Sequence, residues 1–200
     1  MRPLVLIHGT WSRYKDWHLK GSPLRAALEA RGFLVYDFLW SGYCGGVPSP
    51  VIVPQDAPEI KGELMLWQSE GEKLLYLCRA LQYEAPDVIS HSHGLQVVSF
   101  AAASGQTFGT VLSLSGPVRK DVEPWRKLAR PNIQKWIQVV DPEDDMTIRE
   151  GLAFDGHFGW VYHLPEADQN IEVPGYGHSG LILDIAAWDR LGLWKAMEVS

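Results

Sequence analysis

The chain has 200 residues, and its composition is that of an ordinary globular protein, with 46% hydrophobic and 21% charged residues. Its 18 basic and 24 acidic side chains give a formal net charge of −6, which excludes a nucleic-acid-binding protein that works by bulk positive charge. No run of 18 apolar residues is present, so we expect no transmembrane helix.

Short apolar runs alternate with amphipathic segments, which predicts one α/β domain over residues 1–200 with a mainly parallel central sheet flanked by helices. Ser22 is the expected N-cap of the first helix, and Pro23 takes its first position. Gly71 weakens the second helix and marks a candidate kink. The expected strands are 3–7, 33–39, 87–90, 110–114, 136–140 and 171–173, and the expected helices after Ser22 are 23–31, 59–83, 95–103 and 181–197.

The most informative segment is Ser90-His91-Ser92-His93-Gly94, which lies between a predicted strand and a predicted helix. A serine at such a turn adopts a strained backbone, and its hydroxyl is held above the sheet edge at the positive end of the helix. Small residues must flank it two positions away on each side, because strand and helix pack closely there. Gly94 meets that need, and Ser90 is small but is not the usual glycine.

This turn resembles the G-x-S-x-G motif of the α/β-hydrolase family. Three more segments agree with the family, each after a predicted strand: His8-Gly9-Thr10 resembles the oxyanion loop, 141–145 the acid loop and Gly177-His178 the histidine loop. The resemblance covers essentially the whole chain and looks closest to small lid-less bacterial lipases and esterases. It implies a minimal α/β-hydrolase fold without a large cap domain.

The resemblance implies a serine hydrolase of short-chain or accessible carboxylic esters, acting through an acyl-enzyme without metal or organic cofactor. Ser92 would be the nucleophile, His178 the base and Asp144 the acid, with Asp141 and Asp145 as alternative acids. The backbone N–H groups of Thr10 and His93 would form the oxyanion hole.

Other residues leave alternatives open. His91 and His93 form an HxH pair that occurs in metal hydrolases, but the following Leu95-Gln96 departs from that motif. His157 and His163 compete with His178 as base, although both precede the predicted last strand. Trp11 and Trp17 either wall the substrate cleft or cover the edge of the core. Segment 116–132, where relatives insert a cap, is too short to enclose a deep chamber.

Two further function classes remain open: an amidase or thioesterase with the same triad, and a catalytically silent binding protein of this fold. The two cysteines, Cys44 and Cys78, have no metal-binding spacing and are expected to be free thiols, with a single bridge as the alternative. The first residues lack a signal-peptide pattern, so we expect a cytoplasmic location. The oligomeric state and the physiological substrate have no signal in the sequence.

Overall fold

The computed structural model describes residues 1–9, 17–40, 58–144 and 163–198. In this part of the chain, six strands form one sheet in the order β2-β1-β3-β4-β5-β6, and every neighbouring pair is parallel. The mainly parallel sheet expected from the sequence is therefore confirmed. The strands are β1 (Arg2–Ile7), β2 (Phe33–Phe38), β3 (Asp87–His91), β4 (Phe108–Leu114), β5 (Ile133–Val140) and β6 (Gln169–Glu172).

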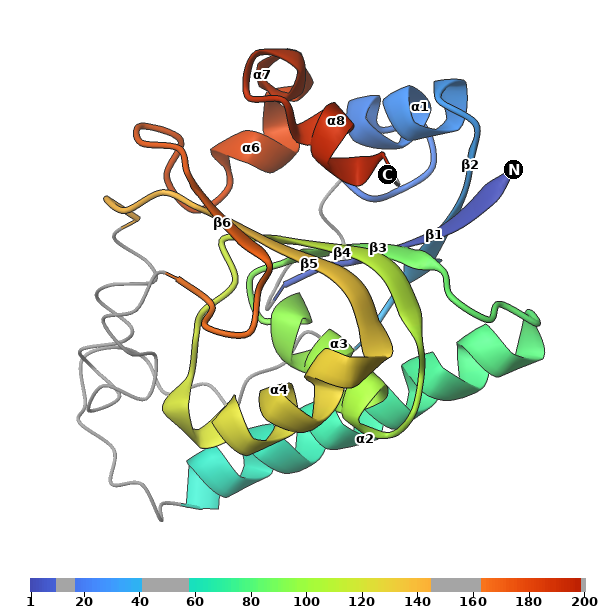
Figure 1. Cartoon of the computed structure of the whole chain (residues 1–200), viewed down its shortest axis with the longest axis vertical. Helices are drawn as coiled ribbons and strands as arrows, with labels where there is room; N and C mark the ends of the chain where they lie inside the picture. Colours follow the sequence, from blue (N-terminus) through green and yellow to red (C-terminus); the bar gives the residue numbers. More distant parts are fainter. Residues whose placement is uncertain (10–16, 41–57, 145–162, 199–200) are drawn as a thin grey trace.

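Helices cover both faces of the sheet (Figure 1). One face carries α1 (Pro23–Ala30), α6 (Gly180–Leu183), α7 (Ile185–Arg190) and α8 (Leu193–Met197), and the other carries α2 (Pro58–Ala80), α3 (Gly94–Ala103) and α4 (Glu123–Ala129). The short 3-10 helices η1 (Lys120–Val122) and η2 (Arg130–Asn132) flank α4. Every residue of β3 and β4 is buried, as expected for parallel strands that are covered on both faces.

Gly71 does not interrupt α2, which runs continuously from Pro58 to Ala80. A Cβ atom at Gly71 would lie 2.6 Å from Cβ of Phe100 and 2.8 Å from the backbone nitrogen of Ala101. The glycine therefore lets α2 approach α3 more closely than any side chain would permit. Close packing of α2 on α3 therefore explains this glycine, which the sequence marked as a candidate kink.

The expected C-terminal helix is not continuous, because it is divided into α6, α7 and α8. Asp184 leaves the helical conformation, and its side chain caps α7 by accepting a hydrogen bond from the N–H of Ala187 at 3.2 Å. Gly192 has a φ of +68°, a left-handed conformation that suits glycine and breaks the helix again before α8. Apolar residues keep a helical spacing across these breaks, and the sequence therefore predicts a single helix.

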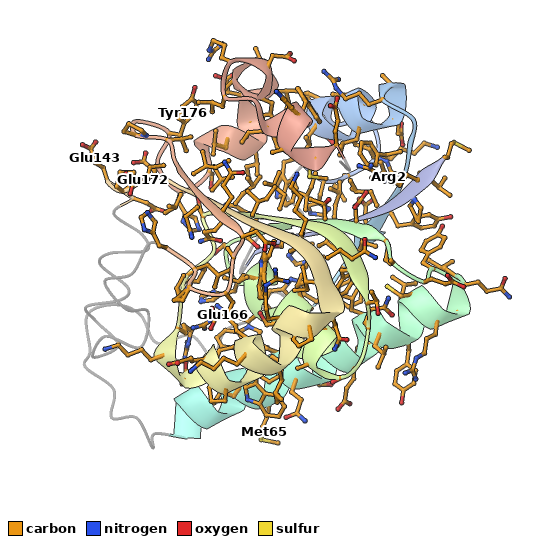
Figure 2. The ribbon with its side chains drawn as sticks, in the orientation of Figure 1. Arg2, Met65, Glu143, Glu166, Glu172 and Tyr176 are labelled. Atoms are coloured by element: carbon orange, nitrogen blue, oxygen red, sulfur yellow. The ribbon has the colours of Figure 1, made fainter. Side chains whose placement is uncertain are left out.

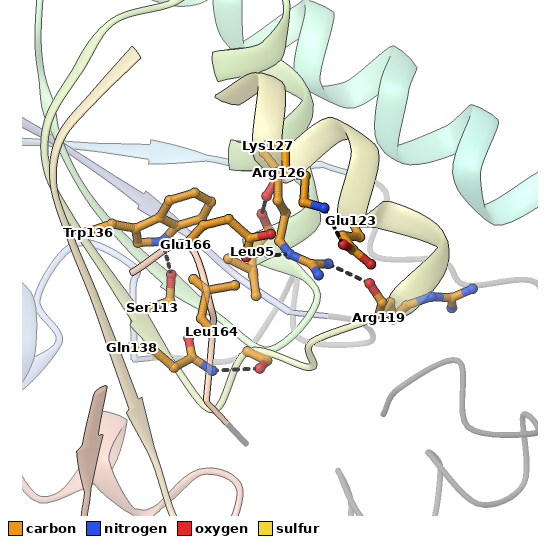
Figure 3. Close-up of polar contacts among 12 residues, drawn as sticks. Leu95, Ser113, Arg119, Glu123, Arg126, Lys127, Trp136, Gln138, Leu164 and Glu166 are labelled. Carbon is orange, nitrogen blue, oxygen red and sulfur yellow. Dashed lines mark hydrogen bonds and ion pairs between the residues drawn. The ribbon is translucent and has the colours of Figure 1, made fainter. Parts of the chain in front are cut away.

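Segment 116–132 contains the crossover helix α4 between β4 and β5, and this helix packs against α3. Arg126 of α4 forms an ion pair of 3.1 Å with Glu166, so the helix is also tied to the segment before β6 (Figure 3). None of the helices in the described parts of the chain combines the length and hydropathy that a membrane span requires.

The carboxyl ends of the parallel strands meet at one edge of the sheet, where ligands commonly bind in open α/β folds. Figure 2 shows Glu143, which follows β5, and Tyr176, which follows β6, at this edge, with Arg2 of β1 toward the other side. All the catalytic candidates named from the sequence and described here follow the carboxyl end of a strand. The topology therefore brings them to one edge of the sheet.

Candidate active site

Ser92 occupies the turn that joins β3 to the ten-residue helix α3. Its φ is +52°, a left-handed conformation that costs a non-glycine residue about 1–3 kcal/mol. The turn is held by the N–H of Ser92, which donates to the carbonyl oxygen of Leu114 at 2.9 Å. Ser92 is only 8% exposed, and its place just before α3 is the one expected for a nucleophile on a strand-to-helix turn.

The small residues around this turn have separate physical reasons. A Cβ atom at Gly94 would lie 2.8 Å from the carbonyl oxygen of Ile7, so glycine is required where α3 begins against β1. Ser90, fully buried in β3, donates from its hydroxyl to the hydroxyl of Ser113 at 3.2 Å. Ser113 also accepts a hydrogen bond of 3.3 Å from the indole N–H of Trp136 (Figure 3). The buried hydroxyl of Ser90, in the usual glycine position, therefore has a hydrogen-bond partner in the neighbouring strand β4.

His178 and Asp144 are brought together from the loops that follow β6 and β5. The ring Nδ1 lies 2.7 Å from Oδ2 of Asp144, and Asp144 is only 1% exposed. With an ionised carboxylate as acceptor, Nδ1 carries the proton and Nε2 remains a proton acceptor. Within the described residues, the Ser92 hydroxyl and the His178 ring share no hydrogen bond. Such contacts commonly tighten only when substrate binds.

Among the described residues, Asp144 and not Asp141 forms the hydrogen bond to the His178 ring, although Asp141 was an alternative acid on sequence grounds. Its buried carboxylate accepts backbone hydrogen bonds from Gly177 at 2.6 Å and from Glu143 at 2.9 Å. It therefore joins the acid loop to the loop that carries His178. Nothing in the sequence indicates this role beyond a second aspartate at the end of β5. Asp145 lies outside the described residues.

The two histidines beside Ser92 have different surroundings, so they do not form a pair of ligands. Nε2 of His91 lies 2.8 Å from the backbone oxygen of His178, and burial lowers the pKa of His91 to about 3. The ring of His93 stacks on Trp67 with 5.0 Å between centroids. Burial, followed by the charge of Arg119, holds the pKa of His93 well below its usual value. Among the described residues, no group of three potential ligands is arranged to hold a metal ion.

Arg119 also contacts Trp67 and is fully buried. Its guanidinium stands 4.8 Å from the ring centroid of Trp67, within the range of a cation–π interaction. Nε and an Nη atom of Arg119 donate to Asp121 at 2.9 and 2.6 Å. This positive charge is therefore balanced by a carboxylate and packed against an aromatic face close to His93.

The loop after β1 packs closely against the turn that carries Ser92. The backbone oxygen of His8 accepts a hydrogen bond of 2.6 Å from the indole N–H of Trp40, and the His8 ring stacks between His18 and Trp40. A Cβ atom at Gly9 would lie only 2.6 Å from Cβ of Ser92, so glycine is needed for this approach. The predicted oxyanion donor Thr10 and the neighbouring Trp11 lie outside the described residues.

The remaining candidates have other surroundings. Trp17 is 3% exposed and packs edge-on against His91 with 6.0 Å between ring centroids, which favours a core position over a wall of the cleft. His163 is exposed and pairs with Glu172 at 2.8 Å. Cys78 is a buried free thiol, and burial raises its pKa to about 12. His157 and Cys44 lie outside the described residues.

Comparison with known proteins gives structural likeness without close sequence similarity. No family model and no curated protein matches the chain. A predicted CIB-like hydrolase from Thermoplasma acidophilum is 16% identical, with a TM-score of 0.57 over 97% of this chain and 85% of that chain. A structure from a study of carboxylesterases of Nitrososphaera gargenis is 15% identical, with a TM-score of 0.57 over 98% and 90%.

A third solved structure, TT1662 from Thermus thermophilus, is 15% identical with a TM-score of 0.56, and the match covers 100% of this chain and 90% of that chain. These matches span most of each protein, and the sheet of this chain is parallel and covered by helices on both faces. The chain therefore has the α/β-hydrolase fold.

Proposed function

We propose that the protein is a serine hydrolase that cleaves carboxylic esters through an acyl-enzyme. The observation that carries the proposal is the 2.7 Å contact between Nδ1 of His178 and Asp144, at the same sheet edge as Ser92 with its φ of +52°. The relatives in the structural comparison that are described as a hydrolase and as carboxylesterases support the same general class.

In the proposed reaction, Ser92 attacks the ester carbonyl carbon while Nε2 of His178 takes the hydroxyl proton. Asp144 holds the Nδ1–H of the ring and stabilises the imidazolium that forms. The tetrahedral intermediate then expels the alcohol, which leaves with the proton from His178. A water molecule attacks the acyl-enzyme with His178 again as base, and the carboxylic acid and the free serine are formed.

The negative oxygen of the intermediate requires hydrogen-bond donors in place before the reaction. We assign this role to the backbone N–H of His93, at the start of α3, and to that of Thr10, after β1. Loss of one such donor typically lowers kcat by about 10²–10³. Trp11, next to Thr10, is a proposed substrate contact. No metal or organic cofactor takes part in these steps.

The first test compares Ser92→Ala with Ser115→Ala, using a p-nitrophenyl ester of a short fatty acid. Ser115 is a matched control, because it also follows a buried strand and has a φ of +50°. We expect Ser92→Ala to lose about 10⁶ in kcat and Ser115→Ala to stay within a few-fold of the wild type. Turnover by Ser92→Ala at the wild-type rate would overturn the proposal.

A second test separates esters from amides and thioesters. Substrates with one acyl group and three leaving groups are compared by kcat/KM on the purified protein. We expect the oxygen ester to be preferred. A higher kcat/KM for the amide or the thioester would leave the proposed triad in place, but it would change the proposed substrate class.

A further inference from the structure

His91 is a buried histidine that the proposed reaction does not use. It is the last residue of β3, immediately before Ser92, and its exposed fraction is 2%. Its Nε2 lies 2.8 Å from the backbone oxygen of His178, which is 87 positions away in the sequence. The two imidazole rings are in contact, with 4.9 Å between their centroids. His91 is therefore bonded to the proposed base and covalently next to the proposed nucleophile.

The hydrogen bond fixes the tautomer of His91. A carbonyl oxygen can only accept, so Nε2 must carry the proton. Nδ1 is buried and has no hydrogen-bond partner within the described residues, and a Cβ atom at Gly9 would lie 3.2 Å from it. A proton on Nδ1 would be buried without an acceptor, so the neutral ring is favoured. This agrees with the lowering of the pKa of His91 to about 3 by burial.

The loop that carries His178 depends on such contacts for its position. Gly175 and Gly177 both have positive φ, at +87° and +57°, a conformation that glycine adopts readily, so contacts from outside the loop help to define the position of His178. Asp141 holds the N–H of Gly177, and Asp144 holds the ring of His178. The carbonyl of His178 is held from β3, by His91. Of the three contacts, this one alone comes from the element that leads directly into Ser92.

We propose that His91 is a positioning residue, whose neutral ring holds the backbone of His178 at a fixed position relative to Ser92. The inference rests on the proposed function, because it assigns the residue a role toward that nucleophile and base. A shift of about 1 Å in a reacting group can lower a rate roughly 10²-fold, so a single hydrogen bond at this place has a large effect on turnover.

The test compares His91→Leu, which cannot donate, with His91→Gln, whose amide nitrogen reaches the place of Nε2. We expect His91→Leu to lose about 10- to 100-fold in kcat with little change in KM, and His91→Gln to recover most of that loss. Asn132→Ala is the matched control, because it removes a side-chain bond of 2.8 Å to the carbonyl of Ala102 near the opposite edge of the sheet. It should change thermal stability and leave kcat unchanged.

A readout that does not need catalysis is the ¹⁵N NMR spectrum of the His178 ring. We expect one Nδ1–H signal in the wild type and in His91→Gln, and a shifted or broadened signal in His91→Leu. If His91→Leu does not fold, His91→Asn replaces it, since its shorter amide cannot reach the carbonyl of His178. An unchanged kcat and an unchanged His178 spectrum in the non-donating variant would overturn the inference.

Failure of the proposed function has a different signature. A fluorophosphonate probe that does not modify Ser92 of the wild-type protein would reject the serine hydrolase, while the NMR comparison would still report whether His91 positions His178. A wild type that is labelled, together with a non-donating His91 variant labelled at the same rate, would reject the positioning role alone.

Discussion

The buried ring of His91 makes a specific prediction about stability in acid. In the unfolded chain this histidine has its usual pKa of 6.5, whereas in the folded protein burial lowers the pKa to about 3. The Asp144 charge and the hydrogen bond to His178 act in the opposite direction, but burial outweighs them. Between these two values the unfolded chain binds the additional proton, so folding stability falls as the pH decreases from 6.5 toward 3.

The magnitude follows from the difference in proton binding. At pH 5 the folded ring is still neutral, because this pH lies well above a pKa of about 3. The unfolded ring is 1.5 pH units below its own pKa of 6.5 and is nearly all protonated. At about 1.4 kcal/mol per unit, acidification from pH 7 to pH 5 should therefore lower the free energy of unfolding by about 2 kcal/mol through His91 alone.

The assay is urea unfolding at pH 7 and pH 5, with the wild type and with His91→Gln. Glutamine does not titrate, while the lowered pKa of His93 contributes to the acid sensitivity of both proteins. The loss between the two pH values should therefore be about 2 kcal/mol larger in the wild type. Equal losses in the two proteins would show that His91 is protonated in the folded state or is exposed to solvent, and would refute this reasoning.

Three further predictions concern the acid, the helix packing and the cofactor. Asp144→Asn should lower kcat about 10⁴-fold, because an amide does not hold the same His178 tautomer, and a loss below tenfold in steady-state assays would contradict its role. Gly71→Ala should lower the free energy of unfolding by about 1–3 kcal/mol, since its Cβ would overlap Phe100; an unchanged urea midpoint would oppose this. Dialysis against a chelator should leave ester turnover unchanged, and a loss restored by added metal would contradict the mechanism.

Local signals in the sequence predicted much of the fold. Ser22 accepts the hydrogen bond of 3.3 Å from the N–H of Arg25 that an N-cap makes, and Pro23 begins α1 as expected. The inner strands β3 and β4 were found because apolar runs that are covered on both faces have few polar residues, whereas the polar edge strand β6 (Gln169–Glu172) begins two residues before the predicted one. Gly94 was also recognised, since a strand-to-helix turn leaves no space for a side chain there.

Features that depend on distant contacts could not be predicted in this way. Gly71 was interpreted as a kink, because only the position of α3 shows that a second helix requires the missing side chain. The family resemblance favoured Asp144, but the role of Asp141 depends on its bond to Gly177, which is 36 positions away. The link between His91 and His178 is of the same kind, since nothing in the local pattern distinguishes it from ordinary packing.

The central claim is that His178 activates the hydroxyl of Ser92, and covalent labelling tests it most directly. The wild type and His178→Gln are treated with a fluorophosphonate probe, and the modified residue and its rate of modification are determined by mass spectrometry. We expect rapid modification of Ser92 in the wild type and slowing by at least about 10³-fold in His178→Gln. Modification of a different residue, or an equal rate in both proteins, would contradict the claim.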